Sequence, residues 1–110
     1  MQTFDEFWLF YLKEHKNPVT RALHFTGTSL SMLIVVWALA SRRPMLLVPA
    51  AICGYAFAWV GHFFVEHNRP ATFKYPLRSL RADFKMLAFA LSGRLAAELQ
   101  RAGVSSPAAR

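Results

Sequence analysis

Two long blocks that carry no formal charge restrict the fold of this chain more than any other feature. Residues 22–41 form the first block, with His24 neutral, residues 45–65 form the second, and Ser41-Arg42-Arg43-Pro44 connects them. A helix of about 20 residues is about 30 Å long, which is roughly the hydrocarbon thickness of a bilayer. Pro44 suits the first turn of a new helix, because the N–H that it lacks has no partner there in any case. The two blocks predict an antiparallel hairpin of membrane-spanning helices.

The segment before the hairpin predicts a helix over residues 3–14 that is too short to span a membrane. Thr3 and Glu6 match a capping box. Its aromatic residues lie on one helical face, and they are Phe4, Phe7, Trp8 and Tyr11. Since Trp and Tyr favour the lipid–water boundary, we expect this helix to lie in the interface, with a core helix of a soluble basic bundle as the alternative. Residues 15–20 are expected to form a turn, with Thr20 as the N-cap of the first span.

The part of the chain after the hairpin is more polar. Residues 69–81 contain four basic residues and two prolines and predict a basic connecting segment. Residues 82–100 predict a third or fourth helix, which packs on the hairpin or dips into the membrane. The fold class is therefore all-α, a single helical membrane domain over residues 1–101 followed by a disordered tail over residues 102–110.

Charge and cysteine content exclude several classes of protein. The net charge is +7, but the apolar residues are concentrated in two blocks, which favours the lipid bilayer over nucleic acid as the partner. Cys53 is the only cysteine, so an intrachain disulfide and a cysteine-pair zinc motif are excluded. One end of the hairpin carries most of the basic residues, namely Lys13, Lys16, Arg21, Arg69, Lys74, Arg78 and Arg81, against Arg42 and Arg43 at the other. The positive-inside rule then places the basic end in the cytoplasm, at the inner membrane if the protein is bacterial.

All four histidines lie in two polar clusters at this basic end, His15–His24 and His62–Pro70. In the second span a stripe of residues recurs every fourth position, and it consists of Ala50, Gly54, Ala58, His62 and Glu66. In the first span His24 shares its face with Gly27, Thr28 and Ser31. Small residues let membrane helices approach closely, so we expect these faces to bring His24 toward His62 and Glu66.

These residues, joined by His15 from the end of the first helix, predict a metal site at the membrane surface. Two histidines and a carboxylate form the ligand set of non-haem Fe(II) oxygenases, and three histidines hold zinc equally well. The structural alternatives are a solvated His15, a His24 bonded to Thr28 or the backbone, and a Glu66 paired with Arg69. His67 does not share the helical face of His62 and is interpreted as an interfacial residue.

The two clusters resemble those of a family of small membrane proteins that includes the yeast 2-hydroxy-fatty-acid dioxygenase of phytosphingosine breakdown. The matching residues of the first cluster are Phe10-Tyr11, His15-Lys16-Asn17-Pro18, Arg21, His24 and Gly27. Those of the second are Trp59-Val60-Gly61-His62-Phe63-Phe64-Val65-Glu66 and Asn68-Arg69-Pro70-Ala71. The resemblance covers roughly residues 4–90.

The resemblance implies an Fe(II)-dependent dioxygenase that shortens 2-hydroxy fatty acids by one carbon, the reaction of fatty-acid alpha-oxidation. The motif histidines of the family correspond to His15, His24 and His62. A 2-hydroxy carboxylate can chelate iron through its hydroxyl and one carboxylate oxygen, which leaves an octahedral position for dioxygen. Arg21, Lys16 or Arg69 is then expected to hold the other carboxylate oxygen. The alternative function is a non-catalytic membrane scaffold or partner-binding protein with structural histidines, and a homo-oligomer is compatible with either.

Overall fold

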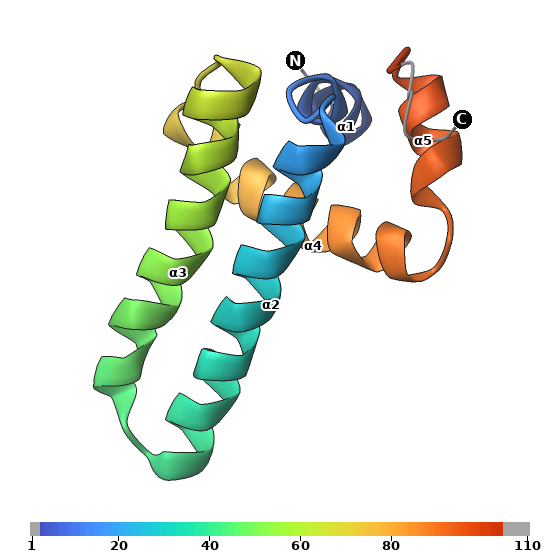
Figure 1. Cartoon of the computed structure of the whole chain (residues 1–110). Helices are drawn as coiled ribbons and strands as arrows, with labels where there is room; N and C mark the ends of the chain where they lie inside the picture. The colour runs from blue at the N-terminus through green and yellow to red at the C-terminus, as the bar shows by residue number, and fades with distance from the viewer. Residues whose placement is uncertain (1–2, 105–110) are drawn as a thin grey trace.

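The two apolar blocks of the sequence form the predicted antiparallel hairpin of helices (Figure 1). The computed structural model describes residues 3–104, and within that range every regular element is helical. Helix α2 covers Pro18–Ser41, and after the short helix η1 (Pro44–Leu46) helix α3 covers Leu47–Val60 and continues into a π-helical turn, η2 (Gly61–Glu66). Both limbs of the hairpin are long and apolar enough to cross a membrane.

The outer surface of the hairpin is apolar. Only 22% and 17% of the apolar windows in its two limbs are buried. Large side chains on this surface include Leu33, Leu39 and Ile52, each more than half exposed. Soluble monomers rarely leave a continuous apolar surface of this size in water. The hairpin therefore has the exterior expected of helices that are surrounded by lipid.

The first helix, α1 (Phe4–Lys13), begins with the predicted capping box between Thr3 and Glu6. The prediction that Thr20 caps the next helix is wrong. Asn17 is the N-cap, and its side-chain oxygen accepts a hydrogen bond from Val19 N at 2.8 Å. Because proline is well tolerated at the first helical position, α2 begins at Pro18 and the predicted turn is shorter.

The C-terminal part differs from the prediction in two places. Helix α4 begins at Pro76 and ends at Leu91, so the second half of the predicted basic connection is helical. The chain then turns at Gly93, whose φ of 78° is left-handed, and continues as α5 (Leu95–Arg101). The predicted helix over residues 82–100 is therefore two helices. Figure 1 shows α4 crossing the direction of the hairpin rather than running along it.

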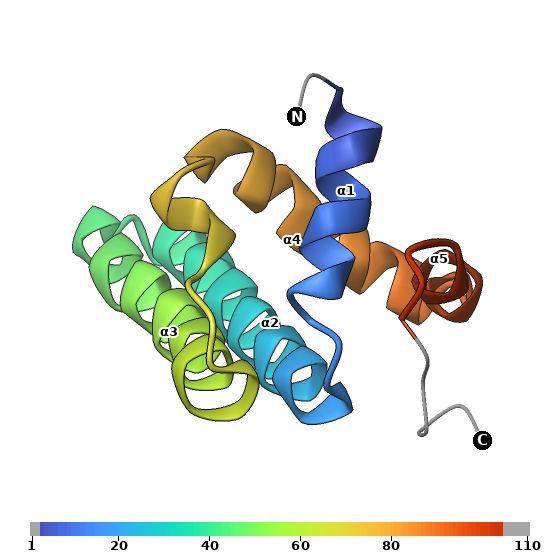
Figure 2. The same ribbon diagram turned by 90° about the horizontal axis from the view of Figure 1, so that it is seen from above.

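A small aromatic core joins α1, α4 and α5, which lie together beside the hairpin in Figure 2. The aromatic face of α1 is buried in it, and the indole N–H of Trp8 donates to Glu98 Oε1 at 2.8 Å. These side chains therefore pack in a protein core, which was the alternative to a position at the lipid–water boundary. Ala102 and Val104, assigned to the predicted tail, are also buried in this core, and residues 105–110 lie outside the described residues.

Two glycines of the hairpin have different surroundings. A Cβ on Gly27 would lie 2.7 Å from Phe57 Cβ and 3.2 Å from the carbonyl oxygen of Gly54, so this glycine allows the two helices to touch. A Cβ on Gly54 would lie 3.6 Å from the Ser31 side chain, which is an ordinary contact distance. Of these two small residues, Gly27 is the one that helix contact requires.

Alanine at these two positions tests this difference. We expect Gly27→Ala to destabilise the hairpin by about 1–3 kcal/mol, because the added methyl group has no room and the helices must separate. The matched variant Gly54→Ala should unfold close to the wild-type temperature. Thermal unfolding of the detergent-solubilised protein, followed by circular dichroism, measures both changes. Equal stability of the two variants would contradict the assignment of the contact.

Candidate functional site

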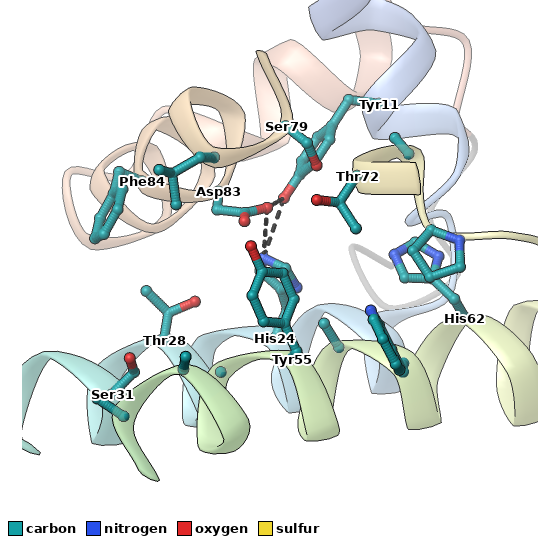
Figure 3. Close-up of a pocket in the computed structure, with 18 of the residues that line it drawn as sticks. Tyr11, His24, Thr28, Ser31, Tyr55, His62, Thr72, Ser79, Asp83 and Phe84 are labelled. Carbon is teal, nitrogen blue, oxygen red and sulfur yellow. Dashed lines mark hydrogen bonds and ion pairs between the residues drawn. The ribbon is translucent and has the colours of Figure 1, made fainter. Parts of the chain in front are cut away.

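Three histidines meet where α1, α2 and η2 come together (Figure 3). The ring centroid of His15 lies 4.4 Å from that of His62 and 5.2 Å from that of His24. These side chains are deeply buried, with exposed fractions of 1%, 2% and 5% for His15, His62 and His24. The fourth histidine, His67, is exposed and lies outside the cluster. The hairpin thus brings together residues from both sequence clusters.

The π-helical turn places His62. Gly61 begins it, and a Cβ there would lie 2.9 Å from Thr20 Cγ2, so the close approach of α2 requires glycine. His67 has a left-handed φ of 60° and ends the turn, after which Asn68 N donates to the carbonyl of His62 at 2.8 Å. Single π-helical turns are rare and occur frequently at functional sites. This one folds the chain back so that the Asn68 side chain reaches the His62 ring.

Hydrogen bonds fix the proton position in two of the rings. His15 Nδ1 lies 2.7 Å from the carbonyl oxygen of Tyr11, which only accepts, so Nδ1–H donates. His62 Nδ1 lies 2.7 Å from Asn68 Oδ1, and the Asn68 amide is oriented by its N–H, which donates to Glu14 O at 3.1 Å. In the neutral forms of both rings Nε2 therefore carries a free lone pair.

The third ring is fixed by Asp83, a residue of α4. Tyr11 donates its hydroxyl proton to Asp83 Oδ1 at 2.6 Å, and His24 Nε2 lies 2.8 Å from the same oxygen. Since a carboxylate only accepts, His24 Nε2–H is the donor and, in the neutral ring, Nδ1 is the bare nitrogen. Sequence reasoning missed the role of Asp83. The available signal was a carboxylate at helical spacing from Ser79 and Met86 on the buried face of α4, where it needs partners.

The bare nitrogens are the unusual feature of the cluster. Within the described part of the chain, His15 Nε2, His24 Nδ1 and Thr20 Oγ1 are buried without a hydrogen-bond partner. An unsatisfied buried polar atom costs about 1–3 kcal/mol, so such atoms call for an explanation. Burial lowers the pKa of His15 well below its usual value, and the neighbouring His24 and His62 lower it further. His15 is therefore neutral at physiological pH, as a metal ligand must be.

Burial and charge act on Tyr11 in the opposite direction. Its pKa is raised well above 10.0, first by burial and then by the charge of Asp83. The hydroxyl consequently keeps its proton, and the hydrogen bond to the carboxylate is maintained. Tyr11 and Asp83 together hold His24 in one orientation.

The other predicted site residues are placed differently. Glu66 Oε2 accepts from Asn17 N at 2.6 Å and so joins η2 to the start of α2. Arg21 is buried, and its Nη1 donates to the carbonyl oxygens of His15 at 2.6 Å and Lys16 at 3.0 Å. The side chains of Lys16 and Arg69 are exposed. A metal site needs at least three His, Cys, Asp or Glu side chains close together. In the present side-chain arrangement, residues 3–104 contain no such group.

A pocket of about 280 Å³ opens from the histidine cluster between the hairpin and α4. Tyr11, His15, His24, His62 and Asp83 line its polar end. The lining changes along the hairpin to Thr28, Ser31 and Gly54, and then to Val35, Leu47 and Ala50. Neither Glu66 nor any lysine or arginine of the described chain is among the lining residues. The pocket is thus a cavity with imidazoles at one end and apolar walls at the other.

Residues 1–95 match the model of a protein family described as 2-hydroxy-palmitic acid dioxygenase Mpo1-like. The chain belongs to this family. The resemblance that the two sequence clusters suggested is thereby confirmed, and the matched segment includes every lining residue of the pocket in this Mpo1-like protein. Searches of curated proteins and of solved structures find no match.

The hydrogen bond of Asn68 makes a prediction about proton position. In the wild-type protein, nitrogen-15 NMR of labelled histidines should show protons on Nδ1 of His15 and His62. In Asn68→Ala the signal of His62 should change to that of a ring that exchanges between both proton positions, because its acceptor is lost. His15 is the internal control, since its partner is the Tyr11 backbone. A His62 that keeps a pure Nδ1–H signal in the variant would contradict the proposed orientation.

Proposed function

We propose that this Mpo1-like protein is a membrane-embedded oxygenase that binds Fe(II) through His15, His24 and His62 and shortens 2-hydroxy fatty acids by one carbon. The observation that carries the proposal is the set of three adjacent imidazoles with fixed proton positions, at the end of a largely apolar pocket. The family description supports the reaction and the class of substrate.

The donor set fits a cation. Three neutral imidazoles that leave positions open are ligands of both iron and zinc. The second nitrogen of each ring is held by the Tyr11 carbonyl, Asn68 or Asp83, which is how outer partners orient metal-binding histidines. Because the side chains do not form a metal-binding group as they stand, binding requires the rings to turn toward a common point. Glu66 as a further ligand stays a prediction, and it would have to release the Asn17 amide.

We favour iron over zinc because the reaction is an oxidation. Bound Fe(II) would supply the redox chemistry that dioxygen needs, whereas zinc has none. The chain's own residues would orient the ligands and keep water from the pocket. Arg21, Lys16 and Arg69, predicted to hold the substrate carboxylate, are absent from the pocket lining. We therefore propose that the carboxylate charge is balanced chiefly by the cation.

Metal analysis tests this proposal. Each of the variants His15→Ala, His24→Ala and His62→Ala should bind Fe(II) at least about tenfold more weakly than the wild type, since even outer partners of a metal contribute 10–100-fold. His67→Asn is the matched control, because His67 is exposed and asparagine tolerates its left-handed backbone. Elemental analysis and oxygen uptake with 2-hydroxypalmitate measure both properties. Full iron occupancy in the three variants would exclude these ligands, and a wild type without stoichiometric metal or substrate consumption would support the scaffold alternative.

We also propose that the hairpin crosses the membrane, with the histidine cluster on the cytoplasmic side. The exposed apolar side chains along both limbs support insertion. The excess of lysine and arginine at the histidine end, against Arg42 and Arg43 at the turn, supports the orientation. A soluble bundle would leave the outer surface of the hairpin in water.

Cysteine labelling measures this orientation. In a Cys53→Ser background, Arg43→Cys should react with a membrane-impermeant maleimide in intact cells, whereas Lys16→Cys should react only after the membrane is opened. Both native side chains are exposed, so access depends on the membrane rather than on burial. Labelling of both positions in intact cells, or of Lys16→Cys alone, would contradict the proposed topology.

A further inference from the structure

The pocket continues below the histidines as a groove between the two limbs of the hairpin. Its lining residues on α2 share one face and are His24, Thr28, Ser31 and Val35. On α3 they run in the opposite direction, from His62 through Ala58, Gly54 and Ala50 to Leu47. From His24 to Val35 a helix rises about 16 Å, at about 1.5 Å per residue. One leaflet of a bilayer is about half of 30 Å, so the groove is about as long as the acyl chain of a membrane lipid.

We propose that this groove holds the acyl chain of the substrate, with Val35 and Leu47 at its end setting the longest chain that fits. The inference rests on the proposed function for the chemistry at the polar end. His15 and His24, each with a buried and unpartnered ring nitrogen, line the same pocket and mark the end where a polar headgroup is held.

Gly54 is the residue that keeps the groove open. Gly27 is needed for helix contact, because a Cβ there would meet Phe57 at 2.7 Å. Gly54 is not needed for contact, since its Cβ would be 3.6 Å from Ser31, yet both Gly54 and Ser31 line the pocket. A larger side chain at this position would therefore fill the groove halfway along its length.

The side of the groove indicates how a lipid enters. Tyr55, Leu80 and Phe84 line the pocket and are also 41%, 47% and 46% exposed on the outer surface. Figure 3 shows Tyr55 rising from α3 and Phe84 lying on α4, on the two walls of the opening. This opening faces the apolar exterior of the hairpin, so an acyl chain can pass sideways from the leaflet into the groove.

Substrate preference in two variants tests the groove. Gly54→Leu should lower the ratio of kcat/KM for 2-hydroxyhexadecanoic acid over 2-hydroxydecanoic acid by at least about tenfold, because the long chain no longer fits. Leu47→Ala, which opens the end, should shift the preference toward longer acids. Ala56→Leu places the same side chain on the exposed outer face of α3 and should leave the ratio unchanged. A ratio that is insensitive to both pocket variants overturns the inference, and a general loss of stability does not alter a ratio.

Photo-crosslinking separates this inference from the proposed function. A 2-hydroxy fatty acid with a diazirine at its ω end should label Val35 and Leu47 of the wild-type protein, as located residue by residue with fragment mass spectrometry. Labelling confined to lipid-facing residues such as Leu33 and Leu39 would overturn the groove. This readout needs no turnover. If the wild type consumes no 2-hydroxy acid, the proposed function fails, while the position of the label still decides whether the groove takes the chain.

Discussion

The carboxylate of Asp83 joins the two parts of this molecule. One of its oxygens accepts from Tyr11 on α1 and from His24 on α2, while Asp83 itself belongs to α4. The hydrogen bonds therefore fasten the aromatic core of α1, α4 and α5 to the hairpin. A half-buried carboxylate that lost these partners would be costly, so their geometry is strongly specified. Without this link α4 would have no polar attachment to His24, and the pocket would lose one of its walls.

The histidine cluster contains buried polar atoms that lower the stability of the fold. The lone pairs of His15 Nε2 and His24 Nδ1 are buried without a partner, although the other nitrogen of each ring donates to the Tyr11 carbonyl or to the Asp83 carboxylate. Arg21 also fixes the backbone of His15, because its guanidinium donates to the His15 carbonyl oxygen. A histidine with a purely structural role would not need a buried ring nitrogen that lacks a hydrogen-bond partner. The arrangement is understandable when the free nitrogens bind a ligand that the fold is built to receive.

The sequence was most informative where a pattern repeats over many residues. The length of the apolar blocks predicted the hairpin, and the Thr3–Glu6 pair predicted the start of α1. Single positions were harder, because two neighbouring residues can serve the same role. Asn17 and Thr20 are both good N-caps, and Pro18 decided between them by allowing the earlier start. Asp83 was missed because its partners lie far away along the chain, in segments whose packing the local pattern does not contain.

The placement of Glu66 has a physical reason of the same kind. The sequence prediction placed Glu66 on the same face as His62, because it took the second span to be α-helical to its end. Instead, Gly61–Glu66 forms a π-helical turn, in which hydrogen bonds link residue i to i+5. The turn therefore changes the angular position of Glu66 relative to His62, and the carboxylate reaches Asn17 N instead. The same change lets Asn68 fold back onto the His62 ring, where its side-chain oxygen holds the imidazole.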